Sequence, residues 1–254
     1  MKKQIVISFI LIGFASTSWG RVFDFNKENF AAYLRGGYIT VPNMVGEDSP
    51  FETSGGNNVE FDTGFKTGSA GEFGFIYSSK VISLKFGVEI LKPTVLNVVG
   101  SSAAGVEYYN LKSDVSVVAP KVGVELNLKQ WPQSKLFLSI DFGTANMVIK
   151  NAYSLNATGA TALSAADFDE DVRGNTSFNE GGLGYEMLMS DSTTFAMDVG
   201  YRSMNFASLK HNKNVTTFQG TYEKGDVAVD NNGNKRTTNL TGYYAGIWFR
   251  FWVK

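Results

Sequence analysis

The sequence contains no cysteine and a single histidine, His211. The first absence excludes disulfide bonds, thiol catalysis and Cys-ligated metal sites, and the second excludes a metal site built on two histidines. Proline is also scarce, with 5 in 254 residues. The formal net charge is only −1, so the chain lacks the basic surface that nucleic-acid binding requires, and no nucleic-acid partner is expected.

Glycine and aromatic residues are abundant instead. There are 27 glycines, and aromatic residues make up 14 % of the chain. A chain rich in glycine and aromatics but poor in proline and cysteine is typical of membrane β-barrels. After residue 20 no apolar run approaches the ~20 residues that a transmembrane helix needs, so any membrane crossing must use strands.

The first twenty residues have the features of a secretory signal. Lys2 and Lys3 precede an apolar run over residues 5–14, and the small residues Ser18 and Gly20 stand before a cut ahead of Arg21. The run is too short for a membrane anchor, which is the alternative interpretation. We therefore predict a signal peptide at residues 1–20 and a single barrel domain at 21–254.

Alternation of apolar and polar residues with period two occurs in eight segments. They are roughly 30–40, 70–77, 81–97, 107–128, 136–152, 178–189, 194–210 and 238–253. Short connections alternate with longer ones at about 41–69, 98–106, 153–177 and 211–237, which places the longer ones at one end of an antiparallel meander. The predicted fold is all-β: an eight-stranded antiparallel up-and-down transmembrane β-barrel with short periplasmic turns and long extracellular loops.

One predicted strand changes parity. Val115 and Val117 occupy odd positions, whereas Val122 and Val124 occupy even ones. An extra residue near Pro120, which cannot donate to a ladder, would explain the change, so a β-bulge is predicted there.

The minority face of the strands carries charges interleaved with glycines, which suits a cramped interior more than a water-facing surface. Charges in a low-dielectric tube must pair, so we predict a plugged lumen; a narrow gated channel lined by the same charges is the alternative. Ile76 and Leu91 are also predicted to face inward. The predicted network comprises Arg35, Glu72, Lys85, Glu89, Lys121, Glu125, Asp141, Glu186, Asp198, Arg202 and Arg250.

Aromatic residues near the strand ends predict the girdles that membrane barrels place at the lipid–water boundaries. These residues are Tyr77, Trp131, Tyr153, Tyr201, Tyr243, Trp248 and Trp252.

The last strand carries Tyr244, Gly246, Phe249 and Phe251 in a spacing that resembles the C-terminal signal by which outer-membrane barrels are recognised for assembly. It departs from that pattern because three further residues, 252–254, follow it. With residues 33–37 of the first strand, the chain resembles small outer-membrane barrels of the OmpA/OmpX/OmpW kind. The resemblance implies the barrel-assembly machinery as a partner. An OmpW-like protein would also have a polar-plugged lower half and an open upper vestibule for small hydrophobic molecules.

Catalytic and metal motifs are weak. His211 lies in a basic stretch and is expected to be a solvated loop histidine; an enzyme would need a serine such as Ser208 beside it. Residues 167–171 have the D-x-D-x-D spacing of a calcium loop, but Val172 and Phe178 stand where that loop has glycine and glutamate. A looser divalent site is the alternative. We therefore expect no catalytic residue, no metal and no cofactor.

Three functions remain open from the sequence. The first is a structural or surface-interaction protein, for adhesion, recognition or envelope integrity; the second is a narrow channel; the third is a lipid-modifying enzyme. Homo-oligomers are conceivable, because Gly36, Thr144 and Ala245 are small and face outward. Outer-membrane lipid and lipopolysaccharide are expected partners, with head groups near the last loop's Lys210, Lys213, Lys224, Lys235 and Arg236.

Overall fold

The computed structural model describes residues 24, 25, 27, 29–41, 66–102, 104–230 and 233–253. The predicted signal peptide and most of the predicted loop 41–69 lie outside these residues. Among the residues described, no helix is both long enough and apolar enough to cross a membrane.

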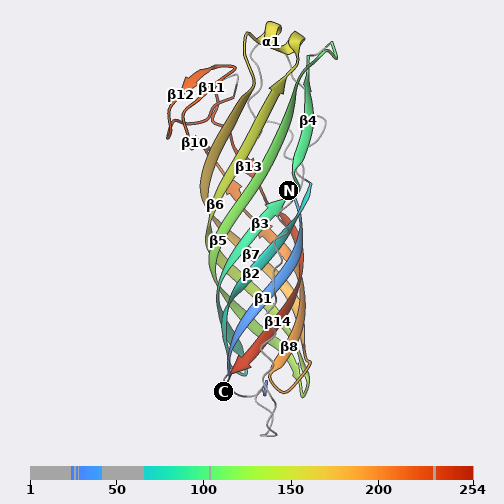
Figure 1. Cartoon of the computed structure of the whole chain (residues 1–254). Coiled ribbons are helices and arrows are strands. Elements are labelled where there is room, and N and C mark those ends of the chain that lie inside the picture. The colour runs from blue at the N-terminus through green and yellow to red at the C-terminus, as the bar shows by residue number, and fades with distance from the viewer. Residues whose placement is uncertain are drawn as a thin grey trace, which may run out of the picture.

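Eight long antiparallel strands close into a ring (Figure 1). β14 pairs with β8 on one side and with β1 on the other, and β7 pairs with β8, so the ring has no open edge. This confirms the predicted eight-stranded barrel. The strands in ring order are β1 (Asn29–Thr40), β2 (Thr67–Ser78), β3 (Ile82–Pro93), β5 (Glu107–Trp131), β6 (Ser134–Leu155), β7 (Phe168–Leu188), β8 (Thr193–Ser203) and β14 (Gly242–Val253).

Three of the strands rise far above the others. β5, β6 and β7 have 25, 22 and 21 residues, against 12 in β1, and they carry the barrel wall up to α1 (Ala157–Leu163) (Figure 1). β4 (Leu96–Ser101) continues the wall by pairing with upper β5.

The described part of the connection from β8 to β14 is folded as well, and we call its residues 204–230 and 233–241 the side lobe. Its β10 pairs with β7, and β13 pairs with β9. The lobe contains β9 (Asn205–Phe206), β10 (Lys210–His211), β11 (Val215–Thr217), β12 (Gly220–Tyr222) and β13 (Thr238–Asn239).

Several predicted boundaries are therefore wrong. Much of the predicted loop 153–177 is strand, because β6 ends at Leu155 and β7 begins at Phe168. The predicted strand 194–210 ends at Ser203, and 81–97 is divided between β3 and β4. For β7 the physical reason is that its upper outer face carries polar residues such as Asp169 and Arg173. The apolar residues there lie on the inward face, so the apolar-outward pattern of the lower strands does not continue.

The predicted β-bulge near Pro120 is wrong. Val118 pairs with Asn146 and Lys121 with Gly143, so β5 and β6 keep one register across this point; the observed shift lies between Asn127 and Lys129. Val115 and Val117 are fully buried and face inward. The apolar parity changes because the lumen itself changes from charged to apolar along β5.

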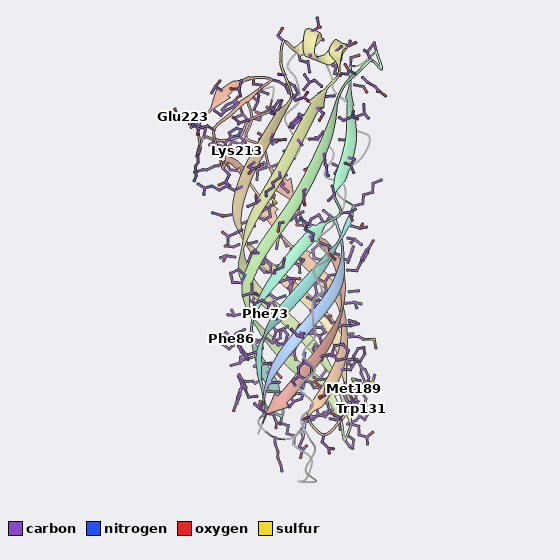
Figure 2. All side chains as sticks on the ribbon, viewed as in Figure 1. Phe73, Phe86, Trp131, Met189, Lys213 and Glu223 are labelled. Carbon is purple, nitrogen blue, oxygen red and sulfur yellow. The ribbon has the colours of Figure 1, made fainter. Side chains whose placement is uncertain are left out.

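The barrel exposes apolar side chains and buries charged ones, which is the reverse of the arrangement in a soluble protein. Side chains along β14 alternate strictly, with Ile247 and Phe249 exposed and Trp248 and Arg250 buried. Figure 2 shows the same outward direction for the labelled Phe73 and Phe86. The exposed face of β14 runs from residue 243 to residue 253. At ~3.3 Å per residue and a tilt of ~40° this length spans about 25 Å, which is the height of the apolar band on a membrane barrel.

The predicted aromatic girdle is right in part. Tyr77, Trp131, Tyr201 and Tyr243 are exposed near the edges of the apolar band, and Trp131 lies at the lower end in Figure 2. The other three predicted girdle residues, Tyr153, Trp248 and Trp252, are buried inside the barrel and do not belong to the girdle. Their positions in the strand alternation place them on the inward face.

Candidate functional site: the filled lumen

The middle of the lumen holds an ionic group that we call the central cluster. Arg202 Nη2 lies 2.7 Å from both Glu89 Oε1 and Glu180 Oε2. Arg35 Nη2 lies 2.8 Å from Asp198 Oδ2, whose other oxygen accepts a hydrogen bond from the Trp248 indole. The cluster comprises Arg35, Glu72, Glu89, Lys121, Glu180, Asp198 and Arg202, all buried.

Three carboxylates of the central cluster converge. Oxygens of Glu72, Glu89 and Glu180 lie within 4.8 Å of one another, a spacing that a metal ion could bridge. Lys121 fills that place: its Nζ is 2.8 Å from Glu72 and 3.3 Å from Glu89, and it also bonds Glu180. The ammonium supplies the positive charge, so the geometry itself does not call for a metal.

A second group, the lower cluster, lies toward the end with the short turns. Arg250 donates to Glu125 at 2.6 Å and to Glu186 at 2.8 Å. Lys85 Nζ lies 3.0 Å from Asp141. The lower cluster comprises Lys85, Glu125, Lys135, Asp141, Glu186 and Arg250, and all are buried.

The structure places all eleven predicted lumen charges in these two clusters and adds Glu180 and Lys135. The sequence carries a signal for both of these added residues, because each has the parity of a predicted inward-facing charge. Glu180 shares the parity of Glu186 on the same strand, and Lys135 shares that of Asp141 just before the predicted strand start. Together the two clusters hold six cations and seven carboxylates, so the charged part of the lumen is close to neutral.

Two glycines make room for a tyrosine in the central cluster. The Tyr33 hydroxyl donates a 2.6 Å hydrogen bond to Glu72, and the ring passes over Gly74 and Gly87. A Cβ on Gly87 would lie 2.2 Å from that hydroxyl, and one on Gly74 would lie 2.8 Å from the ring. Small residues beside long charged ones are therefore a packing requirement here.

Above the charges, apolar side chains fill the lumen and form what we call the apolar core. It includes Leu91, Val115, Val117, Met147 and Phe206. The upper vestibule is thus closed by packed side chains, which departs from the open one that the OmpW resemblance implies. Ile76, also predicted to face inward, lies lower, against Trp248 and its neighbours. A ring cluster caps the apolar core at its upper end: Tyr109, Tyr153, Phe168 and Phe218.

A buried polar group fastens the side lobe to β7, and we call it the Glu170 cluster. Arg236 of the lobe makes a two-pronged contact with Glu170, at 2.6 and 2.9 Å, and Asn151 donates to the same carboxylate at 3.1 Å. Burial would raise the pKa of Glu170, but Arg236 and these hydrogen bonds hold it below its usual value. The loop position of Arg236 suggested a surface site beside lipid head groups, but its side chain is buried in this cluster.

His211 also belongs to the Glu170 cluster, so the expectation of a solvated loop histidine is wrong. Its side chain is 1 % exposed, its ring stacks on Tyr222, and its Nδ1 lies 3.5 Å from Glu170. Burial lowers the pKa of His211, which favours the neutral ring. Pairing of β10 with β7 turns this residue inward, a long-range contact that the local sequence does not encode.

The calcium-like spacing at 167–171 does not form a loop. Residues from Phe168 onward belong to β7, so Asp169 faces outward while Glu170 points into the barrel. Asp167 accepts a 2.7 Å hydrogen bond from the Leu155 amide. Asp169 and Asp171 therefore lie along the outward face of an extended strand and do not converge as ligands of a loop would, while Glu170 between them faces inward.

The residues of the predicted assembly signal divide between the two faces of β14. Phe249 and Phe251 face outward, and Gly246 and Tyr244 face inward. The Tyr244 ring lies 4.6 Å from the Arg35 guanidinium, so this residue also belongs to the lining of the central cluster.

The fold and the filled lumen define an eight-stranded transmembrane β-barrel. No family model and no curated protein matches the sequence. The chain resembles solved structures of small outer-membrane barrels: OprG from Pseudomonas aeruginosa, at 13 % identity over 90 % of this chain and 98 % of that one, with a TM-score of 0.45. It also resembles a major outer membrane protein from Thermus thermophilus, at 10 % identity over 89 % of this chain and 99 % of that one, with a TM-score of 0.47. A third similar structure is outer membrane protein W from E. coli, at 17 % identity over 87 % of this chain and 97 % of that one, with a TM-score of 0.31.

Proposed function

We propose that this protein is a closed, non-enzymatic outer-membrane barrel that acts through the surface it displays. In this proposal residues 1–20 are cleaved on export, the assembly machinery inserts the barrel, and the end carrying α1 and the side lobe faces outward. The observation that supports it most strongly is the filled lumen. Ionic clusters occupy its lower part and the apolar core its upper part.

The energetics of the lumen oppose an ion path. An ion entering the central or lower cluster would have to displace carboxylates and cations that already neutralise one another. Breaking such buried pairs costs several kcal/mol for each ion left uncompensated. The apolar core above would then surround the ion with side chains such as Val115, Val117 and Met147, which offer it no polar group.

The outward surface is more elaborate than the barrel needs. The side lobe is held to β7 by the Glu170 cluster and exposes polar residues such as Glu223 and Lys213 (Figure 2). A folded, anchored surface of this kind suits adhesion, recognition or envelope integrity. Catalysis receives no comparable support, because His211 is buried and faces Glu170 and Tyr222.

Single-channel recording tests the proposal. The chain from Arg21 to Lys254 would be refolded and placed in a planar lipid bilayer, with folding verified by a heat-shifted band on an unboiled gel. We expect a silent bilayer. Reproducible discrete steps that change with Glu89→Ala or Arg202→Ala would overturn the closed-barrel proposal and establish a channel.

The second candidate is a narrow passage for small hydrophobic molecules. The apolar core above a polar lower half favours it, because apolar side chains are the lining that such a solute requires. Vesicles carrying the protein should then take up a hydrophobic fluorescent probe faster than empty vesicles. Equal rates would remove this candidate.

The orientation can be tested independently. The native chain has no cysteine, so single-cysteine variants label cleanly. Glu223→Cys in the side lobe should react with a membrane-impermeant maleimide on intact cells, whereas Lys80→Cys in the turn before β3 should react only after lysis. The opposite pattern would reverse the proposed orientation.

A further inference from the structure

The outer wall of the barrel carries two hollows that both lie over β3, β5 and β6, and the lower one also extends over β2. The lower hollow has a volume of about 500 Å³ and is apolar, with the rings of Phe86 and Phe142 beside Val122. The upper hollow has a volume of about 490 Å³ and is lined by Ser116, Val118, Asn146 and Val148, with Lys92, Asp114 and Lys150 around them.

The two hollows are neighbours along β5 and β6, and we treat them together as one groove. Pro120 and Thr144 line the lower hollow, while Val118 and its cross-strand partner Asn146 line the upper one two residues further along each strand. From Val122 to Asp114 the groove follows eight residues, or about 26 Å at ~3.3 Å per residue. It therefore reaches from the apolar band into the polar wall above it.

The upper part of the groove carries cations held near a carboxylate. Lys92 forms an ion pair with Asp114, and Lys150 is the cross-strand partner of Asp114. Both lysines are exposed. On the outer wall of β3, β5 and β6 around this part of the groove, the cations Lys92, Lys112 and Lys150 stand beside one carboxylate, Asp114, and the next carboxylate, Glu107, lies at the far upper end of β5.

We propose that this groove binds one molecule of lipopolysaccharide through its lipid A, with an acyl chain in the lower hollow and the phosphorylated sugar head at Lys92 and Lys150. The groove joins an apolar part at membrane depth to a cationic part at the boundary, which is the polarity of an anionic lipid. Ammonium groups make strong charge-assisted hydrogen bonds with phosphate, and Ser116 and Asn146 offer partners for sugar hydroxyls.

Lipid A fits better than a second copy of this chain or a phospholipid. The polar upper half would leave the cations facing like cations in a symmetric contact between copies. Two lysines beside one carboxylate suit a head group with more than one phosphate, whereas an ordinary phospholipid presents one. The choice of an outer-leaflet lipid rests on the proposed function, because it requires the side-lobe end to face outward.

Native mass spectrometry of the folded, detergent-solubilised protein tests the proposal. The probe is bisphosphorylated hexa-acyl lipid A, and the comparison lipids are its dephosphorylated form and phosphatidylglycerol. We expect one tightly bound lipid A, weaker binding of both comparison lipids, and a loss of about fivefold in affinity for each lysine removed, or about 25-fold for Lys92→Gln with Lys150→Gln. Lys80→Gln with Lys129→Gln, at the other end of the barrel, is the matched control.

A second variant tests the lower hollow. Thr144→Trp places a bulky ring in the groove and should block binding even though both lysines remain. A heat-shifted gel band checks that each variant folds. Equal binding of phosphatidylglycerol, an unchanged affinity in the double lysine variant, or full binding to Thr144→Trp would each overturn the lipid A site.

These results are separable from those on the proposed function. Channel steps in the bilayer would overturn the closed barrel without affecting lipid binding in detergent. A reversed cysteine-labelling pattern would overturn the assignment to an outer-leaflet lipid, even if lipid A bound in detergent.

Discussion

Replacing Arg202 with methionine should strongly destabilise the barrel. The guanidinium is 3 % exposed and donates to Glu89 at 2.7 Å and to Glu180 at 2.7 and 3.0 Å. Methionine keeps much of the volume but removes the charge. Glu89 and Glu180 are then left to share the Lys121 ammonium, and the next cation, Arg35, lies 3.6 Å from Glu89. Removing one partner from a buried ion pair costs about 3–5 kcal/mol, so we expect the free energy of unfolding to fall by that amount.

The measurement is urea unfolding of the barrel folded into lipid vesicles, followed by tryptophan fluorescence. Trp248 is a suitable reporter because its ring is buried beside the central cluster. The matched control is Lys213→Met, which removes a 3.7 Å contact with Asp171 made by a side chain that is 44 % exposed. An exposed pair of this kind contributes only about 0–1 kcal/mol.

Adding Glu180→Gln to Arg202→Met should restore part of the lost stability, because it removes a carboxylate left without its strongest partner. Partial recovery would show that the cost arises from uncompensated charge and not from packing. A loss below about 1 kcal/mol for Arg202→Met, equal to the surface control, would refute the argument that the lumen charges are held by mutual neutralisation.

Three other perturbations test the packing and the polar contacts. Gly87→Ala places a Cβ 2.2 Å from the Tyr33 hydroxyl and should cost about 1–3 kcal/mol in the same unfolding assay, whereas Gly36→Ala meets no atom within 4 Å and should be neutral. Tyr33→Phe removes a 2.6 Å hydrogen bond to a buried carboxylate and should cost about 1.5–3 kcal/mol. Acidification should loosen the side lobe. Burial lowers the pKa of His211 in the folded protein, and pairing with Arg236 lowers the pKa of Glu170 despite its burial. Each group therefore contributes stability at a pH above its ordinary pKa (~6.5 for histidine and ~4.3 for glutamate), and this contribution is lost as the pH falls through the lowered pKa of the folded protein. The protection factors of the lobe amides, which are corrected for the intrinsic pH dependence of hydrogen exchange, should therefore fall in two steps on acidification, and His211→Gln should retain only the lower step; protection factors that do not vary with pH would contradict this.

The sequence by itself was sufficient for the barrel. Within the apolar band each strand meets lipid on one face and a tight lumen on the other, so alternation is strict, as in β14. The same parity placed all eleven predicted charges inside; Glu180 shares it within the predicted strand 178–189, and Lys135 shares it one residue before the predicted strand 136–152.

Tertiary structure decided what lies above the band. There the outer face is polar and the inner face apolar, so Val115 and Val117 reverse the pattern without any bulge. The side lobe folds through contacts between residues far apart in the chain, such as Glu170 with Arg236. Local periodicity reports the environment on each side of a strand, so it specifies strands where that environment is uniform. It carries no information on which distant segment completes a buried pair, and only the packed barrel supplies it.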